Sequence, residues 1–164
     1  AAAGSHPLHP QRHAAARNLK AEFRVQDVVE LQGESLFDLI VDGHCLHCIV
    51  YDEDRGKLYA ALSRLLKPDG ALVIETMARH PAVRFDKAFL LDDLGVLWLR
   101  FPKGNPEDLK RIGDDWYHPN RRILHPEELS DEIRRAGFSI EWMNVERQTP
   151  PEETWLYQAI ARKT

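Results

Sequence analysis

Apolar residues follow two different periodicities along this chain. Residues 37–42 place apolar side chains at four of their first five positions, which is typical of a strand buried on both faces. Residues 71–75 form a second run of this kind. Between these runs, residues 55–66 space their leucines three or four apart, on one face of a helix. The pattern therefore predicts a strand–helix–strand unit in an α/β protein.

Weaker patterns surround this unit. The predicted elements are a helix over 11–19, a strand over 22–28, a turn at 67–70, a strand over 96–101, a helix that begins at Pro126 and ends at Gly137, and strands over 138–144 and 154–162. The early elements favour parallel pairing through crossovers, and the last two strands favour an antiparallel hairpin. We expect a mostly parallel sheet that ends in this hairpin, with an irregular insert at about 77–124.

Length, net charge and cysteine count exclude several classes of protein but do not identify a reaction. The chain has 164 residues, which suit one domain, and its first ten residues are expected to be a linker or a frayed terminus. A net charge of −4 argues against a nucleic-acid partner, and no apolar run reaches the length that spans a membrane. Both cysteines fall in one short segment, so we expect no disulfide framework and a cytoplasmic location.

The strand at 37–42 ends on Asp42, and polar or reactive residues come directly after it: Gly43, His44, Cys45, His47 and Cys48. Ligands of open α/β sheets bind beyond the carboxyl ends of the strands, so this segment is the first candidate site. His44 and His47 are candidate general bases, and Asp42 is either a ligand contact or a cap for the turn that follows. A zinc site and a redox C-x-x-C remain weaker alternatives, and we expect two buried, unreactive thiols.

Several segments in a fixed order carry a family resemblance. They are Phe23-Arg24-Val25-Gln26-Asp27-Val28, Phe37-Asp38-Leu39-Ile40-Val41-Asp42, Leu65-Leu66-Lys67-Pro68-Asp69-Gly70-Ala71-Leu72-Val73-Ile74, and Arg135-Ala136-Gly137-Phe138 before the closing hairpin. In this order they resemble the C-terminal two-thirds of a class I S-adenosylmethionine (SAM) dependent methyltransferase, from about residue 11 onward. The resemblance implies a Rossmann-like sheet and transfer of a methyl group from SAM to a small-molecule acceptor, which leaves S-adenosyl-L-homocysteine.

The resemblance also assigns cofactor-binding residues. Asp27 would contact the adenine amino group and Val28 the adenine face, although a turn-forming aspartate and a core valine are equally ordinary explanations. Asp42, Gly43 and His44 would lie near the methionine part of SAM and its methyl group.

Catalytic and substrate-binding roles are assigned in the same way. His47, or else His44, is the candidate base, and Glu75 ends the strand at 71–75 as a candidate substrate contact. In the insert, Trp116, Tyr117 and Arg121 fit a lid over a small substrate, or else a minor core with solvated cations. No metal is expected at this site.

The chain departs from the family at the glycine-rich turn that holds SAM, because no G-x-G-x-G occurs in it. The resemblance then implies that the first two strands of the sheet are absent. A truncated chain is the favoured explanation, and a degenerate member that serves as a dimerisation or regulatory module is the alternative. Unpaired strand edges would in either case promote self-association.

Overall fold

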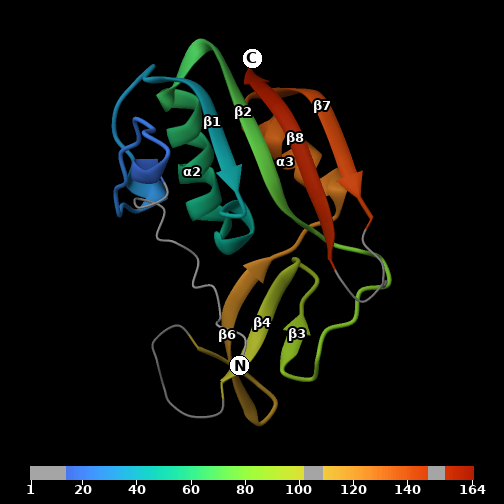
Figure 1. Cartoon of the computed structure of the whole chain (residues 1–164). Helices are drawn as coiled ribbons and strands as arrows, with labels where there is room; N and C mark the ends of the chain where they lie inside the picture. Colours follow the sequence, from blue (N-terminus) through green and yellow to red (C-terminus); the bar gives the residue numbers. More distant parts are fainter. Residues whose placement is uncertain (1–13, 102–108, 148–153) are drawn as a thin grey trace, which may run out of the picture.

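The main sheet is a four-stranded layer with the order β1-β2-β8-β7 (Figure 1). The computed structural model describes residues 14–101, 109–147 and 154–164. The strands of this sheet are β1 (Phe37–Gly43), β2 (Leu66–Ala78), β7 (Phe138–Glu146) and β8 (Trp155–Lys163). β1 pairs with β2 in parallel, whereas β2 with β8 and β7 with β8 pair antiparallel. The closing hairpin is confirmed, but the expectation of a mostly parallel sheet is wrong for the described residues.

The two helices that the sequence predicts are present, and both cover one face of this sheet. They are α2 (Asp52–Leu65) and α3 (Pro126–Arg135), and both lie behind the sheet in Figure 1. Their leucines and isoleucine form one buried cluster with alternate residues of β2 and β8; its members include Leu58, Leu62, Leu129, Ile133, Leu72, Ile74, Tyr157 and Ala159. α3 begins with a proline and a capping box, and Gly137 follows it at a φ of +86°. In the part of the chain described, no helix is long and apolar enough to cross a membrane.

The predicted strand at 22–28 is absent, and this corrects the sequence analysis. Residues 19–27 have no regular structure, and Val28–Glu30 form the short 3₁₀ helix η1. A strand needs a partner for its backbone groups, and alternation alone does not supply one. Of the predicted helix at 11–19, residues 14–16 are helical and residues 11–13 lie outside the described residues.

The predicted turn at residues 67–70 is contained within β2. Phe37 pairs with Leu66 and Leu39 with Ala71, so the register passes over the four residues between them. Gly70 lies in this irregularity, where an added Cβ would stand 3.0 Å from the carbonyl oxygen of Phe37. A glycine is therefore required by close approach of the two strands.

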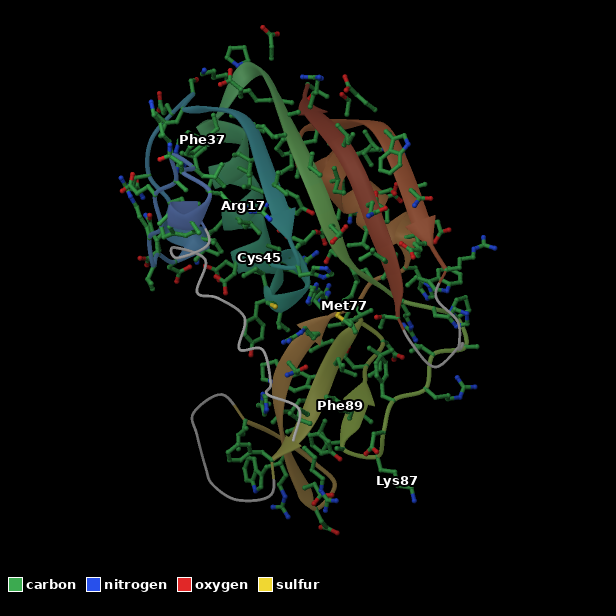
Figure 2. The ribbon with its side chains drawn as sticks, in the orientation of Figure 1. Arg17, Phe37, Cys45, Met77, Lys87 and Phe89 are labelled. Atoms are coloured by element: carbon green, nitrogen blue, oxygen red, sulfur yellow. The ribbon has the colours of Figure 1, made fainter. Side chains whose placement is uncertain are left out.

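A second sheet occupies much of the segment at 77–124 and is more regular than the sequence pattern indicates. Its strands are β3 (Phe89–Leu91), β4 (Val96–Phe101), β5 (Lys110–Ile112) and β6 (Asp115–Arg122), in the antiparallel order β3-β4-β6-β5. The strand expected at 96–101 is confirmed as β4. β6 contacts the 3₁₀ turn η2 (Leu46–Cys48), so the second sheet lies against the carboxyl end of β1. Figure 2 shows Cys45 and Met77 at this junction of the two sheets.

One edge and one face of the main sheet stay open in the described structure. β1 and β7 are the edge strands of this sheet, and the β1 residues Phe37, Leu39 and Val41 are 46%, 53% and 61% exposed. Val41 continues a row across the face that carries no helix, through Val73 and Ile160 to Trp142. Apolar alternation on an unpaired strand is typical of a surface that another polypeptide covers.

Candidate functional site

The ends of β1 and β2 bring the predicted polar cluster together. In the parallel register Gly43 lies beside Glu75, and the backbone N–H of His44 donates to the carbonyl of Glu75 at 2.9 Å. Parallel strands present their carboxyl ends at the same edge of a sheet, so Asp42 and Glu75 both lie near this edge, although β2 continues to Ala78 and the expectation that Glu75 ends its strand is wrong. This edge is the candidate site.

Asp42 caps the turn that follows β1. Its Oδ1 accepts the backbone N–H groups of Cys45 at 2.8 Å and Leu46 at 3.3 Å, and its side chain is buried. Burial raises the pKa of Asp42, although the two backbone hydrogen bonds oppose that shift. The capping role that the sequence left open is therefore real, and it fixes the start of the turn.

His47 lies on this turn with its imidazole buried. Nδ1 lies 3.1 Å from the hydroxyl of Thr76 and accepts the backbone N–H of Met77 at 3.4 Å. An Nδ1 that accepts this bond assigns the ring proton to Nε2. Burial, followed by the charges of Arg121, His44 and Arg55, lowers the pKa of His47 to about 4. The imidazole is therefore neutral near pH 7 and a weak base.

His44 is held differently, at the surface of the same edge. Its backbone takes the left-handed conformation at a φ of +68°, which is unusual for a residue with a side chain. Its Nε2 lies 3.1 Å from Oε1 of Glu75, and about half of its side chain is exposed. The other oxygen of Glu75 accepts from Gln158 at 2.8 Å, and Asn144 donates to Gln158 at 3.2 Å. This polar row across three strands fixes Glu75 and, through it, the His44 ring.

The predicted adenine contacts do not join this edge through any hydrogen bond or ion pair among the described residues. Asp27 is exposed, and its Oδ1 accepts the N–H of Val29 as the cap of η1. Val28 packs partly buried against the main core. Asp42 pairs with Ile74 on the helix-covered face of the sheet, whereas Glu75 pairs with Gly43 on the other face, so the two carboxylates lie at the same edge but on opposite faces, and Asp27 caps a separate turn.

The predicted substrate residues of the insert lie along β6. Arg121 lies on β6, which contacts the η2 turn that carries His47, and its charge contributes to the lowered pKa of His47. Tyr117 packs against the minor core of Val50, Val96 and Trp98. Trp116 pairs with Phe101 and lies about 16 Å along the strand from Arg121, at roughly 3.3 Å per residue. Of these three residues, Arg121 is the one that the structure brings to the edge.

The two thiols are more exposed than expected. Cys48 is exposed and Cys45 half-buried, so the expectation of two buried thiols is wrong. Burial is the largest cause that raises the pKa of Cys45, which disfavours its thiolate. Across the described residues, no three His, Cys, Asp or Glu side chains lie together as a metal site would require.

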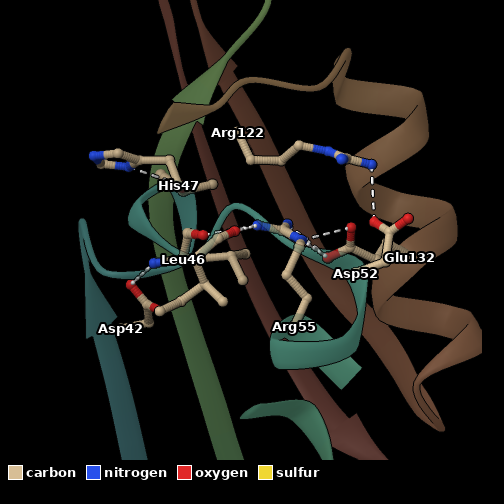
Figure 3. Close-up of polar contacts among 9 residues, drawn as sticks. Asp42, Leu46, His47, Asp52, Arg55, Arg122 and Glu132 are labelled. Carbon is tan, nitrogen blue, oxygen red and sulfur yellow. Dashed lines mark hydrogen bonds and ion pairs between the residues drawn. The ribbon is translucent and has the colours of Figure 1, made fainter. Parts of the chain in front are cut away.

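Arg55 is an important residue that the sequence analysis missed. It is 2% exposed, and its Nη1 donates to the carbonyls of Leu46 at 2.7 Å and Ile49 at 2.9 Å (Figure 3). The rest of the guanidinium binds the carboxylate of Glu132 on α3 at 2.7–3.2 Å. An arginine on the leucine-lined face of α2, one turn before Leu58, was the signal available in the sequence.

Two cavities in the described structure are lined by residues outside this edge. One, of about 650 Å³, lies between α2 and α3 and is lined by Arg55, Tyr59, Arg122 and Glu132 among others. Another, of about 620 Å³, lies between α3 and β7 beside Trp155. No predicted site residue lines either cavity. The candidate site is therefore an open edge in the described structure.

The sequence of the chain is similar to a methyltransferase domain family and to curated methyltransferases. The profile of a family described as a methyltransferase domain matches residues 5–74. A ubiquinone biosynthesis O-methyltransferase of Xanthomonas axonopodis pv. citri is 28% identical over 133 residues, which cover 79% of this chain and 47% of that protein. The chain thus spans about half the length of the curated relatives it matches.

Solved structures of methyltransferases are similar to this chain in fold. The 1,6-didemethyltoxoflavin-N1-methyltransferase of Burkholderia thailandensis, with bound 1,6-didemethyltoxoflavin and S-adenosylhomocysteine, superposes with a TM-score of 0.61. It is 23% identical, and the match covers 94% of this chain and 57% of that chain. A SAM-dependent methyltransferase of Methanosarcina mazei gives a TM-score of 0.64 at 23% identity, over 88% and 68% of the two chains. These likenesses show the fold.

Proposed function

We propose that this chain, which carries part of a class I SAM-dependent methyltransferase domain, forms the acceptor side of an enzyme that methylates a small-molecule hydroxyl group. The observation that carries the proposal is the His44–Glu75 pair at the joint carboxyl end of β1 and β2. Curated relatives are O-methyltransferases, and a hydroxyl must lose a proton as it attacks, so a base at this edge suits that acceptor.

His44 is the base in this proposal. With Nε2 directed at Glu75, the ring proton lies on Nε2, and Nδ1 keeps a free lone pair. Nδ1 would take the proton of the acceptor hydroxyl as the hydroxyl oxygen becomes methylated, and Glu75 would stabilise the imidazolium that results. SAM supplies an electrophilic methyl group on a sulfonium, and S-adenosyl-L-homocysteine is released. His47, with its low pKa, donates a hydrogen bond through Nε2 instead of acting as the base.

The residues at this edge could hold the methionine part of SAM but not its nucleotide part. Gly43 has no atom within 4 Å of the position where a Cβ would stand, so a ligand can approach its backbone closely, and His44 follows it. Asp42, Gly43 and His44 would hold the methionine part of SAM. Asp27 and Val28 would reach the adenine in the complete sheet. The nucleotide part needs a glycine-rich turn on a polypeptide segment that pairs with the open edge of β1.

Substrate contacts come from both sheets in this proposal. Glu75 and Arg121 flank the edge, and Arg121 would favour an acceptor with an anionic group. Trp116 and Tyr117 belong to the sheet that would cover the acceptor, farther from the reacting atoms. A cytoplasmic location belongs to the same proposal.

The test is a fusion that completes the sheet. The half of the Xanthomonas relative that precedes its match is joined to this chain, and S-adenosyl-L-homocysteine is titrated calorimetrically. We expect saturable binding by the fusion and much weaker binding by the chain alone. His44→Ala should reduce methyl transfer to a panel of phenols by about 10²–10⁴-fold, the usual contribution of a general base, which is a larger effect than its weakening of S-adenosyl-L-homocysteine binding. A folded fusion that binds no S-adenosyl-L-homocysteine would overturn the proposal.

A non-catalytic dimerisation module is the second candidate, and the free edge of β1 favours it. Two copies that pair β1 antiparallel would bury Leu39 and Val41 against their symmetry mates. Light scattering should then show a dimer that Leu39→Lys converts to a monomer, whereas Leu90→Lys on the exposed surface of β3 should leave the mass unchanged. A monomer at all concentrations would exclude this candidate.

A further inference from the structure

We propose that Arg55 and Glu132 form a clamp that positions His47, by fixing the turn of residues 45–49 against α3. The inference rests on the proposed function only in taking the carboxyl edge of β1 and β2 as the site. Nothing in the sequence resemblance or in the comparisons assigns a role to either residue. The evidence is the geometry of the clamp itself.

Side chains bind both the backbone N–H groups and the backbone carbonyls of this turn. The carboxylate of Asp42 accepts the N–H groups of Cys45 and Leu46, and the guanidinium of Arg55 donates to the carbonyls of Leu46 and Ile49. Leu46 therefore binds a carboxylate through its N–H and a guanidinium through its carbonyl. His47 lies between the two carbonyls that Arg55 binds, so its backbone cannot move without breaking one of these charge-assisted bonds.

Glu132 connects this turn to a distant element. It lies on α3, 77 residues away from Arg55, and binds Nε and Nη2 of the same guanidinium. The side chains of Arg55 and Glu132 are 3% and 17% exposed, so the pair is shielded from solvent. A planar guanidinium can serve two carbonyls and one carboxylate at once, whereas a lysine ammonium on a flexible stem lacks that fixed fork.

The clamp explains how His47 stays buried next to several charges. The groups that affect its titration are Arg121 on β6, His44 after β1 and Arg55 on α2. Release of the turn would let solvent reach the ring, and its pKa would then rise toward 6.5. Loss of the Arg55 charge alone would also raise this pKa, so a test must separate charge from position.

The test follows the His47 ring by NMR titration, together with amide hydrogen exchange of Cys45 and Leu46, in the chain without cofactor. Arg55→Lys keeps the charge but not the fork, Glu132→Gln keeps the shape but not the carboxylate, and Arg134→Lys is the matched control. Arg134 lies on α3 in an exposed ion pair with Asp131. Unfolding temperature is recorded for each variant.

We expect the pKa of His47 to rise by about one unit in Arg55→Lys and both amides to exchange about tenfold faster. Glu132→Gln should change both in the same direction by less, and Arg134→Lys should change neither. A lower unfolding temperature in Arg55→Lys with unaltered His47 titration and exchange would show a purely structural ion pair and overturn the inference. Because no cofactor is used, this outcome is independent of whether the edge binds SAM.

Discussion

At the scale of single residues, the site follows from short sequence separations. Asp42, His44 and His47 were predicted as site residues because they lie at the end of a strand or directly after it, and a turn of this length cannot separate them widely. Asp27 and Arg55 show the limit of this reasoning. The position of Asp27 relative to the edge depends on tertiary packing, and the partners of Arg55 include a carboxylate 77 residues away. Periodicity carries no information about such a pair.

The buried imidazole of His47 makes stability depend on pH. Its pKa is about 4 in the folded chain and near 6.5 in the unfolded chain, so the unfolded state binds the proton more readily. The stabilisation that His47 gives the folded state is fully present above pH 6.5 and is lost as the pH falls from 6.5 toward 4. Over this range the free energy of unfolding falls by about 3 kcal/mol at most. His47→Asn can still accept the N–H of Met77. Urea unfolding should show a smaller loss between pH 7 and pH 5 in this variant than in the native chain, and equal losses would contradict this assignment.

At the scale of elements, strong periodicity predicted what the structure contains. α2, α3, β7 and β8 appear where the sequence placed them, because each buries one regular face in the common core. Residues 22–28 have the alternation of a strand but no neighbouring strand in the described structure. Residues 67–70 have the composition of a turn but lie within the bounds of β2. Whether each segment belongs to a strand depends on the strands available to pair with it. Local composition does not identify those pairing partners.

Two glycines test the pairing of β1 with β2. An added Cβ on Gly70 would meet the carbonyls of Phe37 and Lys67 at 3.0 and 3.1 Å, whereas Gly43 has open space. Gly70→Ala should therefore destabilise the chain by about 1–3 kcal/mol through overpacking. Gly43→Ala should stay within about 0.5 kcal/mol of the native chain. Equal urea midpoints for the two variants would argue against the close approach of the strands at Gly70.

At the scale of the whole molecule, the described residues combine a well-packed, helix-covered face of the main sheet with an unpaired edge at β1. The helix-covered face holds the main core, while the other face presents the apolar row from Val41 to Trp142. Apolar positions in the sequence predicted a core but could not show that, among the described residues, no helix would cover the other face of the sheet. The absence of the glycine-rich turn was the clue, since it predicted that the strands next to β1 would be missing.

The central claim is that the carboxyl edge of β1 and β2 is a SAM-binding edge, and S-adenosyl-L-homocysteine can test this in the chain itself. The ligand is titrated to millimolar concentration into ¹⁵N-labelled chain while amide chemical shifts are followed. We predict saturable shifts concentrated on residues 42–47, with the cavity between α2 and α3 unaffected. Shifts absent from Gly43 and His44, or strongest in that cavity, would contradict the claim.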